Sequence, residues 1–275
     1  DDEAGRGYAK HLNRWMSPGP DDDHSGRGQI GGWGPVRHLP QYTAAGVERV
    51  MAPAVTFDAG MTLVELDLDF LSSRLSERGL AVSRDALQEA VPASWRRYDQ
   101  QVTLGAGHPW QAMMATLLEV AGVERDVEAT VAWLWSEQPT RNLWRKPIAD
   151  MVALARELAA RGVRVAVLSN SEGKLAELLA EIGIADPFVA IIDSGRVGIE
   201  KPDPRIFAHA LETIGAPSAV HIGDSWSADI EGARGAGWRS IWYRSRPAKG
   251  GIADSSVAIA RDADETRAAL AAFGI

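Results

Sequence analysis

The chain has 275 residues, of which 45% are hydrophobic and 24% are charged; these are ordinary values for a folded globular protein and exclude wholesale disorder. This length suits one large α/β domain, or a core with a smaller partner domain. The formal net charge of -8 disfavours nucleic acid and anionic membranes as partners. The sequence has no cysteine, which excludes a disulfide framework, a thiolate zinc site and a cysteine nucleophile.

The first 50 residues differ from the rest of the chain. They contain the aperiodic stretch SPGPDDDHSGRGQIGGWGP, which predicts a flexible N-terminal extension over residues 1–50. The opening residues lack the basic-then-apolar pattern of a secretory signal, and no apolar run is long enough to cross a bilayer. By elimination, we expect a cytoplasmic protein without a membrane partner.

The next segments predict a strand and then a helical region. The apolar run MAPAVTF ends at Asp58 and is typical of a short buried strand. Residues 66–147 carry apolar side chains at three- and four-residue spacing, as in WQAMMATLLEVAG and EATVAWLW. We expect this region to form a helical insert whose tryptophans pack in its core.

Strand and helix patterns alternate after the insert. We predict strands over 163–169, 188–193, 219–224, 239–243 and 256–260, and helices over 151–162, 174–183, 204–214, 228–237 and 261–274. This alternation is typical of an α/β fold, a doubly wound parallel sheet with helices on both faces. The predicted core comprises 51–65 and 148–275, and the helical region 66–147 is inserted between these two parts.

Polar residues follow several of the predicted strands. Each of them alone is explained as a turn or helix-capping residue. The carboxyl ends of parallel strands meet at one edge of a sheet, so these side chains should lie together there. They are Asp58, Ser169, Asn170, Lys201, Asp224 and Asp229.

Together these groups suit phosphoryl transfer. A carboxylate such as Asp58 can attack phosphorus and form an aspartyl-phosphate. Oxygen ligands from Asp58, Asp224 and Asp229 suit Mg²⁺, which offsets the negative charge. Lys201 adds a second positive charge, and the Ser169 hydroxyl and following amides can hold phosphate oxygens. The expected partner is therefore a small phosphorylated molecule.

The segments VTFDAGMTL, VAVLSNS, GIEKPDPRIF and HIGDSWSADIEGARGAG, in this order, resemble the four motifs of the haloacid dehalogenase superfamily. The resemblance covers residues 53–64 and about 148–242. It implies a Rossmann-like core, and the insert between the first two motifs resembles the helical cap of some members. It also implies a hydrolase that uses magnesium.

The resemblance implies a role for each matching residue. Asp58 would be the nucleophile, and Lys201 would stabilise it and the phosphoryl group. Ser169 would bind the transferred group with help from the Asn170 backbone, and Thr62 would support the turn after the nucleophile. The metal ligands would be Asp58, the Gly60 carbonyl, Asp224 and Asp229, the last directly or through water.

Gly60 departs from the family pattern. Phosphatases of the family usually carry a second Asp at this position, as general acid and then base. Glycine has no side chain for either step, and general acid–base catalysis typically contributes about 100- to 10,000-fold. The sequence therefore indicates a slow phosphatase, or one whose leaving groups need little protonation, such as acyl phosphates. Candidate substitutes are His108 in the segment GHPW, Glu65 and Asp67.

Gly60 also leaves other functions open. The fold could bind a phosphorylated metabolite or a protein without turnover, although a pure binder needs no nucleophile. A dehalogenase fits less well, because such members typically have an aromatic residue at this position and lack the metal-binding Asp. A phosphonatase needs a cap lysine, and Lys146, the only lysine between the first two motifs, lies at the cap exit.

Overall fold

The computed structural model describes residues 53–104, 109–243 and 254–275. The predicted extension, residues 1–50, and His108 lie outside these ranges. Six strands form one sheet in the order β5-β4-β1-β6-β7-β8, with every neighbouring pair parallel. The strands are β1 (Ala54–Phe57), β4 (Val165–Ser169), β5 (Ala190–Asp193), β6 (Ala219–Gly223), β7 (Arg239–Tyr243) and β8 (Val257–Ala260). The predicted parallel sheet is confirmed.

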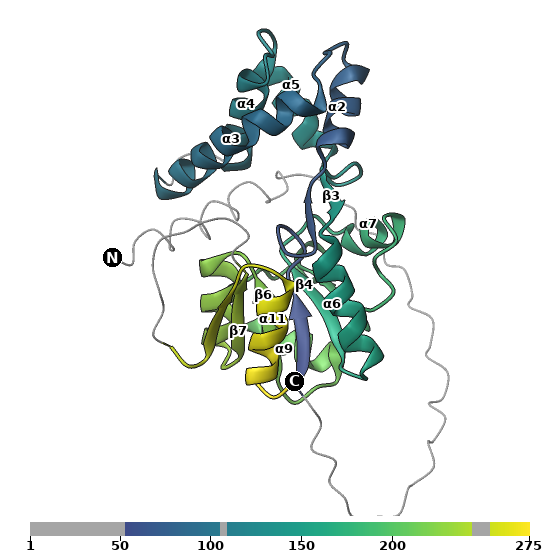
Figure 1. The fold of residues 1–275 in the computed structure, drawn as a ribbon, viewed down its shortest axis with the longest axis vertical. Helices are drawn as coiled ribbons and strands as arrows, with labels where there is room; N and C mark the ends of the chain where they lie inside the picture. The colour runs from purple at the N-terminus through teal and green to yellow at the C-terminus, as the bar shows by residue number, and fades with distance from the viewer. Residues whose placement is uncertain (1–52, 105–108, 244–253) are drawn as a thin grey trace, which may run out of the picture.

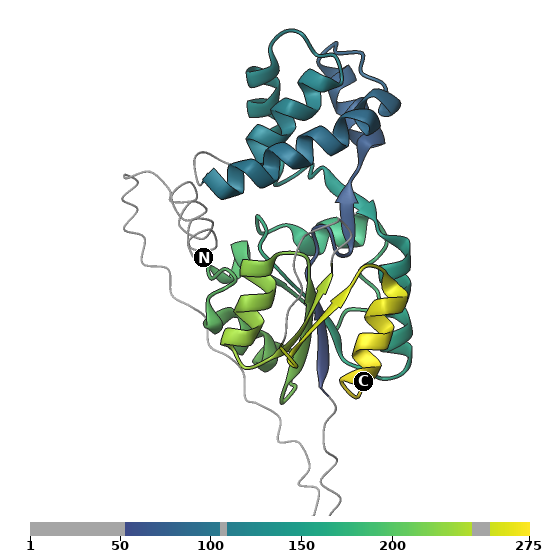
Figure 2. The same cartoon turned by 60° about the vertical axis from the view of Figure 1, so that its left-hand side comes forward.

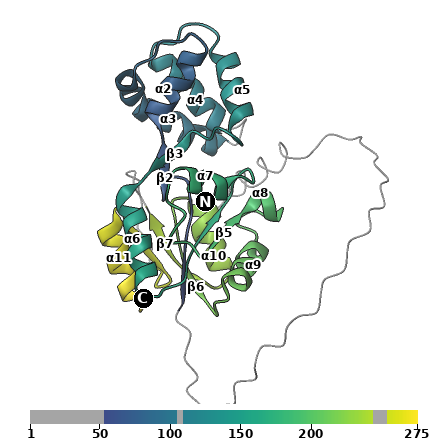
Figure 3. The same ribbon diagram turned by 90° about the vertical axis from the view of Figure 1, so that its right-hand side faces the viewer.

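Helices cover both faces of this sheet (Figure 3), because side chains alternate between the faces along each strand. One face packs on α6 (Ala149–Ala160), α7 (Leu175–Glu181) and α11 (Ala263–Ala272). The other face packs on α9 (Pro204–Ile214) and α10 (Gly232–Gly235), while α8 (Ser194–Val197) follows β5 directly. The doubly wound α/β class is therefore confirmed.

A separate group of helices lies beyond the carboxyl ends of the strands (Figures 1 and 2). These are α2 (Leu68–Glu77), α3 (Arg84–Leu104), α4 (Pro109–Val120) and α5 (Val127–Glu137). They share their own apolar core, in which Trp110 is 8% exposed, and Trp95, Trp133, Trp135 and Trp144 pack against it. None of the described helices has both the length and the apolar character that a bilayer crossing requires.

Two short antiparallel strands connect the helical group to the sheet. They are β2 (Val64–Leu66) and β3 (Trp144–Pro147), and Glu65 pairs with Lys146 across them. The sequence predicts a mostly helical insert over 66–147 and no strand within it, so β3 is a difference from that prediction. The two chain crossings between the helices and the sheet thus run side by side as a two-stranded ribbon.

Candidate active site

Asp58 lies in a tightly bonded turn at the carboxyl end of β1. Its backbone amide donates to Ile222 O at 2.8 Å, which keeps it tied to β6, and the Leu63 amide donates to Ala59 O at 2.8 Å. Met61 has a left-handed backbone, with φ of 56°. The side chain of Asp58 is 12% exposed, so the turn presents a mostly desolvated carboxylate with one side open.

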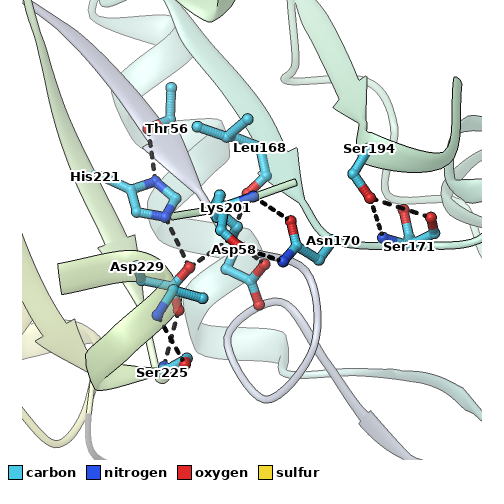
Figure 4. A network of polar contacts seen from close by, with 11 residues as sticks. Thr56, Asp58, Leu168, Asn170, Ser171, Ser194, Lys201, His221, Ser225 and Asp229 are labelled. Atoms are coloured by element: carbon cyan, nitrogen blue, oxygen red, sulfur yellow. Dashed lines mark hydrogen bonds and ion pairs between the residues drawn. The ribbon is translucent and has the colours of Figure 1, made fainter. Parts of the chain in front are cut away.

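Lys201 is the centre of the buried polar network (Figure 4). Its ammonium donates to Asp58 Oδ1 at 2.7 Å, to Leu168 O at 2.8 Å and to Asp229 Oδ1 at 2.5 Å. An ammonium has three N–H groups, so all of its donors are used. Burial alone would lower the pKa of Lys201, but Asp229 and Asp58 together raise it above its ordinary value. Lys201 is therefore a fixed, permanently charged cation beside Asp58.

A chain of hydrogen bonds behind Lys201 holds Asp229 in place (Figure 4). His221 Nε2 lies 3.0 Å from Asp229 Oδ1, and its Nδ1 lies 2.8 Å from the Thr56 hydroxyl. The Ser225 amide donates to Asp229 Oδ2 at 2.8 Å. Because the carboxylate can only accept, Nε2 carries the proton, and Nδ1 of the neutral ring accepts from Thr56. Burial, the largest effect, lowers the pKa of His221, which favours this neutral ring.

The two carboxylates on Lys201 have opposite pKa shifts. Burial raises the pKa of Asp58 above its ordinary value, although Lys201 counteracts part of this. Burial also acts to raise the pKa of Asp229, but Lys201 and His221 outweigh it and hold that pKa below its ordinary range. Asp229 is thus the firmly ionised partner, and Asp58 is the less stabilised anion.

Asn170 fixes the loop that carries Lys201. Its side-chain amide donates to Lys201 O at 2.9 Å, and its Oδ1 accepts from the Lys201 amide at 2.8 Å. Ser169, the last residue of β4, is 3% exposed and pairs in register with Asp193 of β5. The structure therefore brings the predicted residues of β4 to the same strand edge as Asp58.

Three carboxylates lie close enough to share a cation. Asp58, Asp224 and Asp229 each offer one oxygen, and these oxygens lie within 4.8 Å of one another. Oxygen-only donor sets suit Mg²⁺, so the residues fit the implied metal. The backbone of Asp224 is also held, because its carbonyl accepts from the Trp242 indole at 2.9 Å.

Gly223 permits the close approach of Asp229 to β6. A Cβ at residue 223 would lie 2.3 Å from both Cγ and Oδ2 of Asp229, closer than side chains tolerate. Asp229 lies in a six-residue π-helix, Trp226–Glu231, and single π turns are frequent at functional sites. Glycine in the GDS segment thus has a steric reason.

Of the remaining predicted residues, Thr62 and Gly60 make no side-chain hydrogen bond to this network in the described structure. Thr62 is fully buried; its amide donates to Ala59 O at 3.3 Å, while its hydroxyl has no hydrogen-bond partner within the described ranges. Gly60 lies two residues after Asp58, and among the described residues beyond its chain neighbours a Cβ there would meet only Asp58 Oδ2, at 3.9 Å. His108 lies outside the described residues.

Sequence reasoning missed His221 and Thr56, and assigned Asn170 only a backbone role. A histidine flanked by apolar residues in AVHIGD was the available clue, because a polar ring inside a buried parallel strand needs partners. Thr56 occupies the matching position of the neighbouring strand, in register with His221. That pairing depends on strand order, which a single sequence does not reveal.

Known proteins with similar sequences include phosphatases. The chain is 29% identical over 209 residues to haloacid dehalogenase-like hydrolase domain-containing protein 3 from Bos taurus, covering 70% of this chain and 82% of the relative. It is 28% identical to glyceraldehyde 3-phosphate phosphatase from Methanopyrus kandleri, covering 70% and 84%. It is 36% identical to phosphoserine phosphatase from Thermus thermophilus, covering 56% and 63%.

Solved structures share the fold of this chain, and a family model identifies its family. The HAD-hydrolase YfnB from Bacillus subtilis, bound to magnesium, has a similar fold with a TM-score of 0.56 at 18% identity, covering 80% of this chain and 99% of that chain. A 2-haloacid dehalogenase from Pseudomonas syringae gives 0.52 at 22%, covering 81% and 100%. The model for haloacid dehalogenase-like hydrolases matches residues 43–237. The resemblance read from the four motifs is confirmed, and the chain belongs to the haloacid dehalogenase-like hydrolases.

Proposed function

We propose that the chain is a magnesium-dependent phosphatase of a small phosphorylated metabolite, with Asp58 as its nucleophile. The observation that carries this proposal is the contact of Asp58 Oδ1 with Lys201 Nζ at 2.7 Å, beside the three-carboxylate cluster. The relatives named above as phosphoserine and glyceraldehyde 3-phosphate phosphatases support this substrate class.

In this proposal the two oxygens of Asp58 would have different tasks. Lys201 occupies Oδ1, which leaves Oδ2 to attack phosphorus. Lys201 is held by Asp229 and the Leu168 carbonyl, so it enters the reaction without reorganising. The Ser169 hydroxyl and the amides after it would hold the phosphoryl oxygens.

The metal would be held by Asp58, the Gly60 carbonyl, Asp224 and Asp229. When bound, Mg²⁺ would neutralise charge as the anionic nucleophile approaches the anionic phosphate. Asp229 has one oxygen bonded to Lys201 and His221 and the other to the Ser225 amide. It therefore orients the lysine as well as contributing to the cation site.

We propose that residues 66–147 form a cap over this site, and that 51–65 and 148–275 form the catalytic core. The helices stand beyond the strand edge that bears Asp58, and the chain passes between them and the sheet through β2 and β3 (Figure 1). Closure of such a lid would exclude water and select the substrate. Residues 1–50 would be an extension outside both parts.

Two other reactions fit less well. A phosphonatase needs a lysine inside the cap, but Lys146 lies on β3, is 47% exposed and pairs with Glu65 at 2.7 Å. A dehalogenase of this family lacks the metal-binding Asp, whereas the acidic cluster here includes Asp224. A binder without turnover is favoured only by the missing side chain at Gly60.

The test is steady-state hydrolysis of p-nitrophenyl phosphate and acetyl phosphate, with and without magnesium, by wild type, Asp58→Asn and Asp224→Asn. We expect turnover that needs magnesium and falls by roughly 10⁴-fold or more in Asp58→Asn, as for other covalent nucleophiles. Asp224→Asn should raise the magnesium concentration needed. Calorimetry measures magnesium binding separately. Magnesium binding by a wild type that shows neither turnover nor phosphorylation of Asp58 would instead favour the binding module.

A further inference from the structure

Gly60 occupies the position beside Asp58 at which an acid–base side chain would be expected. Among the described residues beyond its chain neighbours, a Cβ on Gly60 would have one neighbour within 4 Å, Asp58 Oδ2 at 3.9 Å. The backbone at Gly60 is not in the left-handed region, so an L side chain meets neither a steric nor a conformational obstacle there. The chain thus has room for a proton-transferring side chain next to Asp58 but does not supply one at this position.

The cation and the imidazole near Asp58 cannot serve instead. Lys201 uses its three N–H groups on Asp58, Leu168 and Asp229, and an ammonium has no acceptor. His221 is fully buried, and both of its ring nitrogens are already hydrogen-bonded, to Asp229 and to Thr56. Neither group can accept a proton from a water molecule that attacks a phosphoryl group carried by Asp58.

The two remaining carboxylates are also committed. Asp229 is 1% exposed and accepts hydrogen bonds at both oxygens. Asp224 belongs to the cluster that would hold the cation, and a ligated carboxylate is a poor base. Among the described residues bonded to Asp58 or clustered with it, each titratable group therefore has another task.

The lack of an acid or base at Gly60 should affect phosphorylation of Asp58 and hydrolysis of the aspartyl-phosphate to different extents. We propose, on the basis of the phosphatase function above, that the chain accepts a phosphoryl group from acyl phosphates onto Asp58 and then retains it. In the first step an Asp58 oxygen bonds to phosphorus, the phosphorus–acyl oxygen bond breaks, and the carboxylate leaves with the electron pair. That leaving group needs no proton, so the absence of an acid at Gly60 has little effect.

The second step does require proton transfer. Water bonds to phosphorus, the bond to Asp58 breaks, and the water proton must pass to an acceptor. The described residues around Asp58 position no base, so the proton goes to solvent or to the phosphate itself, and the rate advantage of general base catalysis is lost, about 100- to 10,000-fold. The aspartyl-phosphate therefore persists, and its breakdown limits turnover.

The experiment follows the phosphoenzyme of the full chain directly. The protein is mixed with acetyl phosphate and magnesium, quenched in acid, and assayed by intact mass for one added phosphoryl group. After the acetyl phosphate is removed, the decay of that species gives its lifetime. We expect near-complete labelling of wild type, no labelling of Asp58→Asn, and a lifetime shortened by about 100- to 10,000-fold in Gly60→Asp.

Gly60→Asn is the matched control, because it adds the same bulk as Asp without the proton-transferring group. It should keep the long lifetime; an equal shortening in Gly60→Asn would overturn the inference. Rapid turnover of acetyl phosphate by wild type without accumulation of the phosphoenzyme would also overturn it, while leaving the phosphatase function intact. If His108→Ala then restored accumulation, His108 would be the base. Neither labelling nor turnover with either phosphate would instead refute the proposed function.

Discussion

The described part of the chain contains two buried cations, each held between two carboxylates, and one of them lies at the candidate active site. Lys201 joins Asp58 and Asp229 at the sheet edge, and its side chain is 1% exposed. Arg74, also 1% exposed, joins Glu77 and Glu137 within the helical group. A buried cation with two acidic partners is therefore not in itself evidence of catalysis.

The surroundings of the two cations differ. The partners of Arg74 reach solvent, with side chains 41% and 34% exposed, and its guanidinium lies over Trp133 at 4.2 Å from the ring centroid. This fits a packing role, in which a planar cation covers an aromatic ring. The partners of Lys201 are 12% and 1% exposed. Asp58 is thus largely desolvated but still reaches solvent, whereas Asp229 does not.

The largest expected effect is on stability and kcat when each cation is replaced by methionine, and it should differ between Lys201 and Arg74. Lys201→Met leaves two buried carboxylates uncompensated, so we expect a loss of about 3–5 kcal/mol in unfolding free energy. We also expect loss of roughly 100- to 1,000-fold in kcat, as for removal of a charge-stabilising donor. Arg74→Met should cost about 1–3 kcal/mol with kcat nearly unchanged, because its partners can be solvated. Urea unfolding and p-nitrophenyl phosphate hydrolysis measure both.

An equal fall in kcat for the two variants, each assayed well below its unfolding midpoint, would contradict this division. It would mean that Arg74 positions the cap for the reaction and is not only a packing residue.

The second prediction concerns Gly223, whose lack of a side chain lets Asp229 reach Lys201. In Gly223→Ala the new methyl group would lie 2.3 Å from Asp229 Cγ, so the carboxylate must move away from Lys201. We expect a loss of about 1–3 kcal/mol from overpacking, together with weaker magnesium binding by calorimetry. Gly235→Ala is the matched control, because a Cβ there meets no other atom within 4 Å. It should stabilise the protein by about 0.4–1 kcal/mol.

Normal magnesium affinity in Gly223→Ala would show that the exact position of Asp229 matters little for the cation. The π turn around Asp229 would then lose its functional explanation.

The smallest expected effect is a pH dependence of stability. It comes from His221, which is hydrogen-bonded to Asp229 beside Lys201. The contacts of Arg74 described above include no histidine. The pKa of His221 is lowered in the folded protein, so below about pH 6.5 the unfolded chain binds more protons than the folded one. Stability should therefore fall as the pH drops below that value, by up to about 1.4 kcal/mol per pH unit. Metal-free urea unfolding between about pH 5.5 and 7.5 measures this slope.

His221→Gln should be flatter in the same window, because the titrating ring is gone. His209→Gln, at an exposed position of α9, should keep the wild-type slope. If His221→Gln kept that slope as well, the acid sensitivity would come from other groups.

The strongly apolar or periodic elements were predictable from the sequence, while the short strands β2 and β3 were not. The predicted helix 204–214 coincides with α9, whose Pro at the first turn and Gly215 at the end mark its limits. The strands β2 and β3 have three and four residues, too few to establish an alternating pattern. The π-helix at Trp226–Glu231 was read as an ordinary helix start, because its form depends on Asp229 turning inward to β6.

Four sequence motifs in order by themselves indicated the haloacid dehalogenase-like hydrolases. Hydrophobic periodicity separately placed Asp58, Ser169 and Asp224 at the ends of strands of one parallel sheet. This was possible because hydrophobic periodicity and turn residues are local properties. Only the tertiary structure decided how the buried charges are paired. The contacts of Thr56 with His221, and of Lys201 with Asp58, join residues 165 and 143 positions apart. Such contacts depend on strand order and register, because both place distant side chains on the same face of the sheet.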